Sequence, residues 1–251
     1  QGVICSISEC RDGAIIVYDD GRMVCCDVMN QQHTVWATQG LASLKRSKNK
    51  SLRAYADQMD NIWLYGQGTL AMYNKGTDSW DTSIGDQLGL TGVGVDRNIN
   101  SMAGDRNGNI WIGSDQLGLL KMNVHTHVVE AVQPRNINDS QSIKEKISIQ
   151  SVYVDDTDLI WVGTEKSGVA YSGNYIYRFG SNLNGDITAI AQDANGTIWY
   201  GTSDKGVIGY EGVMASKKVA TMATTPDGSL WVGSKRNGLT RIKNGTSTIY
   251  S

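Results

Sequence analysis

The chain has 251 residues, a formal net charge of −2, 29 glycines and only 2 prolines. This length suits one large domain, and many glycines with few prolines suit tight hairpins and argue against disordered linkers. The near-neutral charge gives no case for binding nucleic acid or a membrane surface, and no apolar run reaches the length of a transmembrane span.

A motif centred on tryptophan recurs along the chain. Its clearest copy has an apolar alternation, a turn at residues 193–196, a strand around Trp199 and a glycine at Gly206. This pattern predicts half-buried strands joined by tight turns. Three such strands are not stable alone, so we expect the unit to repeat.

Six copies follow in chain order, although the first carries isoleucine in place of tryptophan. The central residues are Ile16, Trp63, Trp111, Trp161, Trp199 and Trp231. In the last four copies a second glycine falls seven residues after the tryptophan, at Gly118, Gly168, Gly206 and Gly238. A fixed offset inside units of varying length is typical of a repeat fold.

The repeat predicts an all-β protein, a β-propeller with six visible four-stranded blades. We place the blades at residues 1–37, 52–82, 99–132, 146–181, 182–216 and 217–251, in a single domain of residues 1–251. The tryptophan is expected to pack between neighbouring blades, and the glycine two residues later to let them approach. The chain starts on an inner strand and ends on an outer one, so either six blades close by side-chain packing alone or a seventh blade lies outside this piece.

Three long connectors join the first four blades, at residues 38–51, 83–98 and 133–145. They should emerge on the same face as the loops that follow the tryptophan strands, opposite the aspartate-containing turns. Long loops on a rigid scaffold often carry binding function, although a merely solvated rim is the alternative. The candidate binding residues on this face are Trp80, Arg97, Asp115, Gln116, Arg135, Glu165, Lys166, Asp204, Lys205, Lys235 and Arg236.

The first connector also holds a basic run, formed by Lys45, Arg46, Lys48 and Lys50. Such a run can engage an acidic sugar, but a solvated loop is favoured because isolated surface charge contributes little.

All four cysteines lie within the first 26 residues, at Cys5, Cys10, Cys25 and Cys26. Cys25 and Cys26 should point to opposite faces of a strand, so they cannot line one site together. The sequence has no CxxC spacing, so a zinc site is not expected. Buried thiols are favoured over a disulfide between Cys10 and either Cys25 or Cys26.

Catalytic and metal-binding patterns are sparse. No nucleophile elbow, phosphate-binding loop or paired carboxylates occur, and the histidines are His33, His125 and His127. The run from Asp155 to Asp158 could suggest calcium, but it aligns with the turn at residues 105–108, which favours a turn whose glycine became aspartate. We therefore expect no catalytic residues, no metal and no cofactor.

The pattern Asp-x-x-Gly-x-Ile-Trp-x-Gly-Thr/Ser followed by Gly-Leu/Val resembles the propeller repeat of two-component regulators, best at residues 99–124 and 186–212. The resemblance implies a periplasmic or extracellular sensor region of a hybrid histidine kinase, as in gut Bacteroidetes, that reports polysaccharide breakdown products. Any kinase would lie outside this chain.

The expected function is therefore ligand sensing, with a streptogramin-lyase-like enzyme or a protein-interaction scaffold as alternatives. The partners we consider are an oligosaccharide, including an acidic one, a partner propeller or protein domain, and a second copy in a homodimer.

Overall fold

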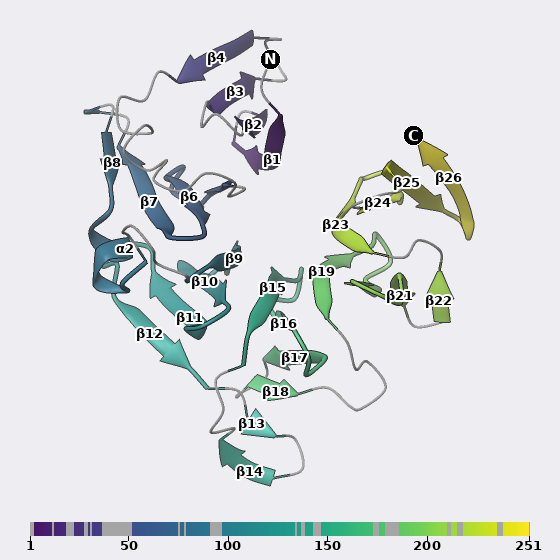
Figure 1. Ribbon diagram of the computed structural model, residues 1–251. Helices are drawn as coiled ribbons and strands as arrows, with labels where there is room; N and C mark the ends of the chain where they lie inside the picture. The colour runs from purple at the N-terminus through teal and green to yellow at the C-terminus, as the bar shows by residue number, and fades with distance from the viewer. Residues whose placement is uncertain are drawn as a thin grey trace. The chain divides into compact units, whose positions relative to one another are not determined.

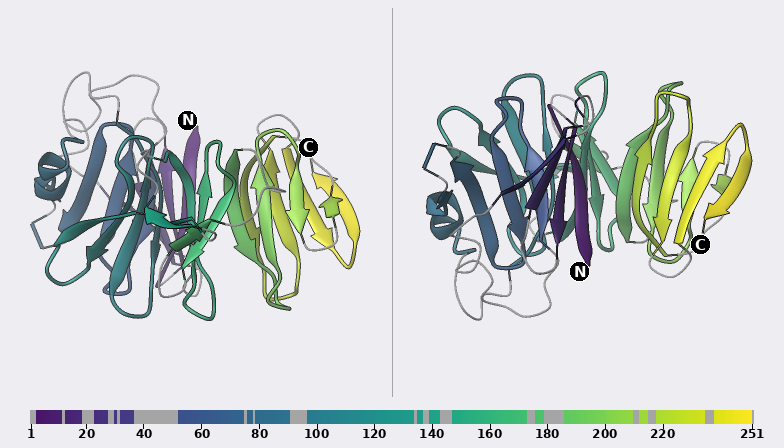
Figure 2. Two further views of the ribbon diagram at one scale, coloured as in Figure 1. Left: turned by 90° about the horizontal axis from the view of Figure 1, so that it is seen from below. Right: turned by 90° about the horizontal axis from the view of Figure 1, so that it is seen from above.

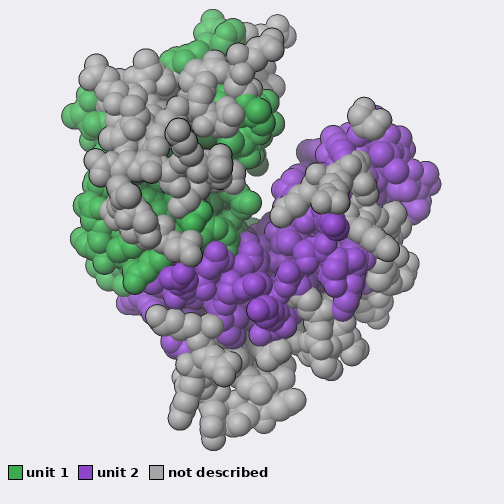
Figure 3. Space-filling model, viewed as in Figure 1, with its two compact units in different colours: residues 1–110, 122–129 green, residues 111–121, 130–251 purple. Residues whose placement is uncertain are grey.

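The computed structural model describes residues 3–11, 13–18, 23–27, 30, 32–36, 52–74, 76–77, 79–90, 97–133, 135–136, 139–142, 147–172, 176–178, 186–209, 212–214, 218–234 and 238–250. The chain divides into two compact units, shown in Figure 3. The first unit holds residues 1–110 and 122–129, and the second holds residues 111–121 and 130–251. Each unit is described by itself.

The first unit opens with two antiparallel sheets whose strands follow chain order (Figure 1). The first sheet is formed by β1 (Ile4–Cys10), β2 (Gly13–Tyr18), β3 (Met23–Asp27) and β4 (Gln32–Trp36). The second is formed by β5 (Arg53–Ala56), β6 (Ile62–Gly66), β7 (Thr69–Asn74) and β8 (Ser79–Asp81). Buried side chains of both sheets, among them Ile15, Val17, Ala54 and Leu64, form one hydrophobic cluster.

The third sheet has residues in both units. Its strands are β9 (Ile99–Gly104), β10 (Asn109–Ser114), β11 (Gly118–Asn123) and β12 (Val129–Val132), again neighbours in chain order. A turn that includes His125 and Thr126 leads into β12.

The second unit contains three further sheets. The fourth sheet has β15 (Ile149–Val154), β16 (Ile160–Thr164), β17 (Val169–Ser172) and β18 (Ile176–Arg178). The fifth has β19 (Ile187–Gln192), β20 (Ile198–Thr202), β21 (Val207–Gly209) and β22 (Gly212–Met214). The sixth has β23 (Val219–Thr224), β24 (Leu230–Ser234), β25 (Gly238–Lys243) and β26 (Thr246–Tyr250). Figure 2 shows the last two sheets, coloured green to yellow, packed face to face.

The described residues thus contain six sheets, and each includes four antiparallel strands in chain order, as the repeat predicts for propeller blades. Five sheets have these four strands alone, and the fourth sheet has two more. The last sheet ends in an outer strand, β26, as expected for a four-stranded blade. Asn244 and Gly245, with φ of 50° and 74°, form the turn that leads into β26.

Two connectors hold structure that the sequence did not predict. The connector at residues 83–98 begins with a short helix, α2 (Ser83–Gln87). The connector at residues 133–145 contains β13 (Arg135–Asn136) and β14 (Asp139–Ser142). Because β13 pairs in parallel with β18, the fourth sheet has six strands: the four that lie within the predicted blade at residues 146–181, and two from the connector before it.

The prediction that Ile16 takes the tryptophan position in the first blade is wrong, because the neighbouring residue Ile15 takes it. Ile15, with no exposed surface, and not Ile16, lies in the cluster between the first two sheets. The cause is the turn: Cys10 pairs directly with Gly13, so only two residues join β1 to β2. The sequence alignment assumed the longer turn of the other blades, and a shift of one residue moves a strand side chain to the opposite face.

The cysteines are free thiols, and each is half-buried rather than buried. Cys25 and Cys26 pair with Ile15 and Ala14 respectively, which confirms that they point to opposite faces of β3.

The glycines of the repeat have two distinct roles. Gly118, Gly168, Gly206 and Gly238 have φ of 74°, 74°, 89° and 67°, a left-handed conformation that glycine adopts without steric cost. The glycine two residues after each tryptophan allows close approach of sheets. A Cβ on Gly163 would lie 2.6 Å from Cγ2 of Ile187, and one on Gly201 would lie 2.5 Å from Cγ1 of Val219.

An aspartate six residues before the tryptophan organises the turn, and the sequence analysis missed this contact. Asp193 accepts hydrogen bonds from the backbone N–H of Asn195 and Thr197, both at 2.9 Å, and from Nε1 of Trp199 at 2.9 Å. In the second and fourth sheets, Asp57 and Asp155 accept the indole N–H of Trp63 and Trp161 in the same way.

The run from Asp155 to Asp158 is a turn, as predicted. Asp155 accepts the backbone N–H groups of Thr157 and Leu159, and Asp158 has φ of 68° where other copies have a left-handed glycine. Aspartate tolerates this conformation better than most residues.

Candidate ligand-binding site

A cavity of about 700 Å³ opens in the first unit where β1 and β5 end. Its walls come from three sheets: the end of β1, the end of β5 with the turn that follows, β6, and β9. The lining residues are Ser8, Glu9, Cys10, Arg11, Ala54, Tyr55, Ala56, Asp57, Gln58, Asp60, Tyr65 and Met102.

Tyr55 is a half-buried phenol on the wall of this cavity. Its hydroxyl group hydrogen-bonds with the backbone of Gly104, and a Cβ on Gly104 would lie 2.4 Å from that oxygen, so the residue must be glycine for the tyrosine to fit. Burial raises the pKa of Tyr55 above its ordinary value, and the negative charges of Asp57 and Asp105 add to this. The phenol therefore stays neutral at physiological pH and can donate a hydrogen bond.

Two of the acidic groups in the cavity wall already have structural partners. Asp57 holds the turn through the N–H groups of Met59 and Asn61 and the indole of Trp63. Asp60 forms an exposed ion pair with Arg11, with 2.8 Å between Nη1 and Oδ2. Glu9 is exposed, lines the same cavity and is the carboxylate best placed to meet a ligand.

The cavity lies at the opposite strand ends from the predicted binding face. It opens beside the turn after β5, whereas the connectors precede β5 and follow the outer strands. No sequence motif marks this cavity. The residues that line it come from three sheets. The groups at residues 8–11 and 54–60 are more than forty positions apart, and Met102 lies more than forty positions further on.

Two of the predicted binding residues lie in the first unit, and both pack against neighbouring structure. Trp80 on β8 contacts Tyr73, with ring centroids 5.2 Å apart, and its buried Nε1 has no hydrogen-bond partner among the described residues. Arg97 donates from Nη1 to the carbonyl oxygen of Leu88 at 2.7 Å, so it holds the end of the α2 segment.

In the second unit, the loops after the tryptophan strands do share a face with the connectors. Oδ1 of Asp115 accepts hydrogen bonds from Ser148 at 3.2 Å and Gln150 at 3.1 Å, both at the start of the fourth sheet. The backbone N–H of Glu165 donates to the carbonyl oxygen of Ser148 at 3.0 Å. Ser148 therefore brings Asp115 and Glu165 together, which supports the predicted placement of these loops.

The other predicted residues of this face are mostly solvated. Gln116 and Asp204 are exposed, and so is Lys205, whose backbone N–H donates to Oγ1 of Thr202 at 2.9 Å. Lys166 lies 4.0 Å from Glu165 in an exposed ion pair. The side chain of Arg135, together with Lys235, Arg236 and the basic run at residues 45–50, lies outside the described residues.

The histidines do not gather. His33 is exposed on β4, His125 lies in the turn before β12, and the ring of His127 meets the edge of Trp63 at 5.8 Å. His125 and His127 both lie between β11 and β12, outside either strand. Within the described ranges, no group of three or more histidine, cysteine, aspartate or glutamate side chains is placed to hold a metal ion.

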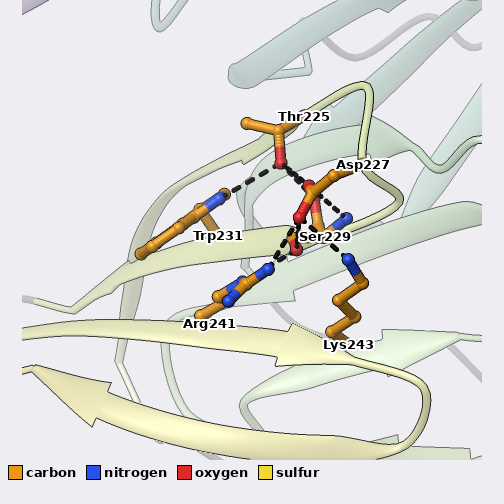
Figure 4. A network of polar contacts seen from close by, with 6 residues as sticks. All are labelled: Thr225, Asp227, Ser229, Trp231, Arg241 and Lys243. Carbon is orange, nitrogen blue, oxygen red and sulfur yellow. Dashed lines mark hydrogen bonds and ion pairs between the residues drawn. The ribbon is translucent and has the colours of Figure 1, made fainter.

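The sixth sheet carries a charged network that the sequence analysis did not foresee (Figure 4). Thr225 stands where the other blades that have a tryptophan carry the aspartate six residues before it. Its Oγ1 accepts the Trp231 indole N–H at 3.3 Å. Asp227 accepts hydrogen bonds from Arg241 at 2.6 Å and Lys243 at 3.0 Å. Hydrogen bonds from Thr225, Lys243 and Ser229 hold the pKa of Asp227 far below its ordinary value.

Comparison with known proteins gives the repeat its identity. The family model described as "Two component regulator propeller" matches residues 94–116 and 182–204. These two segments of the chain carry the repeat of two-component regulator propellers. The matched segments contain the Trp111 strand and the Trp199 turn, the copies on which the resemblance was based. No curated protein matches the chain.

Solved structures agree on the fold. A virginiamycin B lyase from Staphylococcus aureus aligns with a TM-score of 0.69 at 11% identity, covering 99% of this chain and 84% of that one. A streptogramin B lyase aligns with a TM-score of 0.65 at 12% identity, covering 100% of this chain and 83% of that one. At these identities the likeness establishes the all-β propeller fold of this chain and says nothing of its chemistry.

The extracellular domain of a hybrid two component system from B. thetaiotaomicron is also similar, at 17% identity and a TM-score of 0.43, covering 94% of this chain and 31% of that one. No helix among the described residues has the length and apolar character needed to cross a membrane.

Proposed function

We propose that this propeller is the ligand-binding part of a sensor of the two-component regulator type, and that it works outside the cytoplasm. The cavity of about 700 Å³ is the observation that carries the proposal, because its volume lies within the range of small-molecule sites. The family repeat supports a sensor role, and a kinase would be supplied outside this chain.

The chemistry of the cavity wall favours an oligosaccharide. Aromatic rings from Tyr55 and Tyr65 offer apolar faces with polar tips, while Glu9 and Gln58 offer polar atoms for hydroxyl groups. The ionised groups of the wall are Glu9, Arg11, Asp57 and Asp60, so negative charge prevails. We therefore favour a neutral or amine-bearing sugar over an acidic one.

Catalysis is not part of this proposal. A lyase mechanism of the kind considered from the sequence needs a histidine beside the ligand, and none of the three histidines lines the cavity. The predicted connector face remains a second candidate surface, because Ser148 joins two of its loops around Asp115.

The experiment compares two exposed glutamates in the same protein. A panel of neutral, amine-bearing and acidic oligosaccharides is screened by thermal shift, and each hit is titrated by calorimetry. Glu9→Gln should weaken binding of a hit by about tenfold, the loss expected when a charged hydrogen bond becomes neutral. Glu130→Gln, at an exposed position on β12 that does not line the cavity, should leave the affinity unchanged.

Equal affinity of the two variants would exclude Glu9 and the cavity as the binding site. If the hit is then lost on Asp115→Asn, the ligand binds the connector face instead. Turnover of any hit, seen as new products by chromatography, would contradict a purely binding role.

A further inference from the structure

Two junctions between neighbouring sheets each hold a tyrosine ring. Tyr55 in β5 and Tyr153 in β15 each pair with the tryptophan of their own sheet, so ring and indole lie on the same face. The Tyr55 hydroxyl group is hydrogen-bonded to the backbone of Gly104 in the third sheet. The Tyr153 hydroxyl group is hydrogen-bonded in the same way to Gln192 in the fifth sheet. Each ring therefore reaches from its own sheet to the next one.

Ser8 takes this position in the first sheet. It pairs with Ile15, which stands where the later sheets have tryptophan and packs against the second sheet. The Oγ of Ser8 donates a hydrogen bond to the carbonyl oxygen of Ala54 in the second sheet. Ser8 therefore faces the second sheet as Tyr55 faces the third, but it carries no ring.

A small residue at this position does not by itself leave a space between sheets. The fifth sheet has Ala191 there, and Ala191 is only 4% exposed because it packs in a cluster with the sixth sheet. Beside Ser8, by contrast, the cavity of about 700 Å³ lies between the first and second sheets, and both Ser8 and Ala56 line it. The cavity therefore includes the place that a tyrosine ring fills at the other two junctions.

Ala56 corresponds to the residues that the two tyrosines reach. It comes directly before the aspartate that organises the turn, as Gly104 and Gln192 do in their own sheets. Gln192 shows that a side chain at this position is compatible with a tyrosine ring beside it. The Cβ of Ala56 therefore does not prevent a ring from lying next to its backbone.

The backbone groups of Ala56 are directed toward the first sheet. The N–H of Asp57 donates to the carbonyl oxygen of Asn61 at 3.0 Å, which places Asp57 among the residues that bond across to β6. Alternate residues of an antiparallel strand turn their N–H and C=O groups to opposite sides, so those of Ala56 point away from β6. The carbonyl oxygen of Ala54 points the same way and accepts the hydroxyl group of Ser8. A ligand in the cavity thus meets a backbone donor and a backbone acceptor at Ala56.

We propose that the cavity binds a six-membered ring that carries a hydroxyl group, in the place that Tyr55 and Tyr153 fill at the other junctions. The ring hydroxyl group is hydrogen-bonded to the backbone of Ala56. A pyranose ring of an oligosaccharide and a phenol ring share this chemistry. The inference rests on the proposed function for the location of the site, and it adds which group of the ligand the cavity recognises.

The test fills the space from the side of the protein. Ser8→Tyr supplies the ring that the other two junctions have, and it should fold because the same residue fits there. Ser247→Tyr is the matched control, since Ser247 is an exposed serine on β26 that does not line the cavity. Binding of p-cresol, methyl glucoside and each oligosaccharide hit is measured by calorimetry.

The wild-type protein should bind at least one of the two small probes with a Kd of about 1 mM or tighter, a weak affinity that suits a ligand of few atoms. Ser8→Tyr should weaken the binding of that probe, and of any oligosaccharide hit, by about tenfold or more. Ser247→Tyr should leave each affinity unchanged. Circular dichroism checks that each variant is folded, and where Ser8→Tyr is not, Ser8→Leu fills the same space and should also weaken binding.

The two small probes separate the two sources of the ring. Methyl glucoside that binds the wild type and is lost from Ser8→Tyr identifies a sugar ring, in agreement with the proposed function. If p-cresol behaves in this way and no sugar binds the wild type, the ring is a phenol, so the inference stands and the oligosaccharide proposal fails.

Two results would overturn the inference. The first is a wild-type protein that binds neither small probe at concentrations up to about 10 mM. The second is binding that the folded Ser8→Tyr variant leaves unchanged. An oligosaccharide that binds this variant as tightly as the wild type would exclude the ring site while the ligand-binding role of the protein stands.

Discussion

The turns of the fifth and sixth sheets reach one backbone conformation by different chemistry. Both have a left-handed glycine three residues before the tryptophan, Gly196 with φ of 83° and Gly228 with φ of 78°. In the fifth sheet the Asp193 carboxylate binds two backbone N–H groups and the Trp199 indole, and no cation of the described residues forms an ion pair with it. In the sixth sheet Thr225 takes the indole, and Asp227 is held by the cations of Arg241 and Lys243.

This difference indicates which contacts of the turn contribute most to the stability of each sheet. One carboxylate in the fifth sheet links the turn directly to the indole that packs between sheets. The sixth sheet divides this task between a neutral hydroxyl group and an exposed ion network, and its tryptophan has Arg241 at 5.7 Å and the ring of Tyr250 at 5.6 Å. We therefore expect the Asp193 hydrogen bonds of the fifth sheet to contribute more to the free energy of unfolding than the Thr225 and Asp227 contacts of the sixth. We also expect their contribution to depend less on salt concentration.

The largest effect is expected for Asp193→Ala. The change removes three hydrogen bonds and leaves the Trp199 N–H without its acceptor, which should lower the free energy of unfolding by about 2 to 3 kcal/mol. Urea denaturation followed by tryptophan fluorescence measures it. A loss below that of the Thr225 variant described next would reverse the ranking of the two turns.

The same aspartate also predicts how stability depends on pH. Burial alone would raise the pKa of Asp193, but the hydrogen bonds from Trp199, Thr197 and Asn195 outweigh it and lower the pKa. A carboxyl group with a lowered folded-state pKa contributes stability above its unfolded value of about 3.9, and this is lost as the pH falls through the folded value. Asp193→Asn should therefore flatten the decline in stability below about pH 4.

A smaller effect is expected for Thr225→Ala. The indole of Trp231 would lose an acceptor at 3.3 Å, a long hydrogen bond between neutral groups, and the cost should be about 1 kcal/mol. The same urea titration measures it, with Thr248→Ala, an exposed threonine on β26, as the control.

The smallest effect is expected for Asp227→Asn, and it should depend on salt. Exposed ion pairs contribute little and are screened by added ions, so the variant should differ measurably from the wild type only at low ionic strength. The Asp193→Asn loss should persist in about 1 M salt, where the Debye length is about 3 Å. Equal salt sensitivity of the two variants would remove the distinction between the turns.

Much of the fold could be predicted from the sequence because its determinants are local. The glycines at fixed offsets have left-handed conformations, and even Asp158 could be recognised as a turn residue from its place in the alignment. The wrong assignment of Ile16 shows the limit of this approach. Nothing near that residue reveals that the preceding turn has only two residues, and the face of a strand depends on that number.

The site could be predicted much less well. Loop length points to the connector face, and the contacts of Ser148 with the Asp115 and Glu165 loops show that these two loops lie beside the start of the fourth sheet. Binding at this face stays a prediction. The cavity depends on where Glu9, Tyr55 and Met102 meet, and they lie on three different sheets. Contacts between sheets are set by packing, and no spacing within one repeat encodes them.

The most direct test of the proposed function is hydrogen–deuterium exchange of the protein with and without an oligosaccharide hit. Binding in the cavity predicts slower exchange in residues 8–11 and 54–60, with little change in the loops around Asp115, Lys166 and Asp204. Slower exchange in those loops, with residues 54–60 unchanged, would contradict the cavity and place the ligand on the connector face.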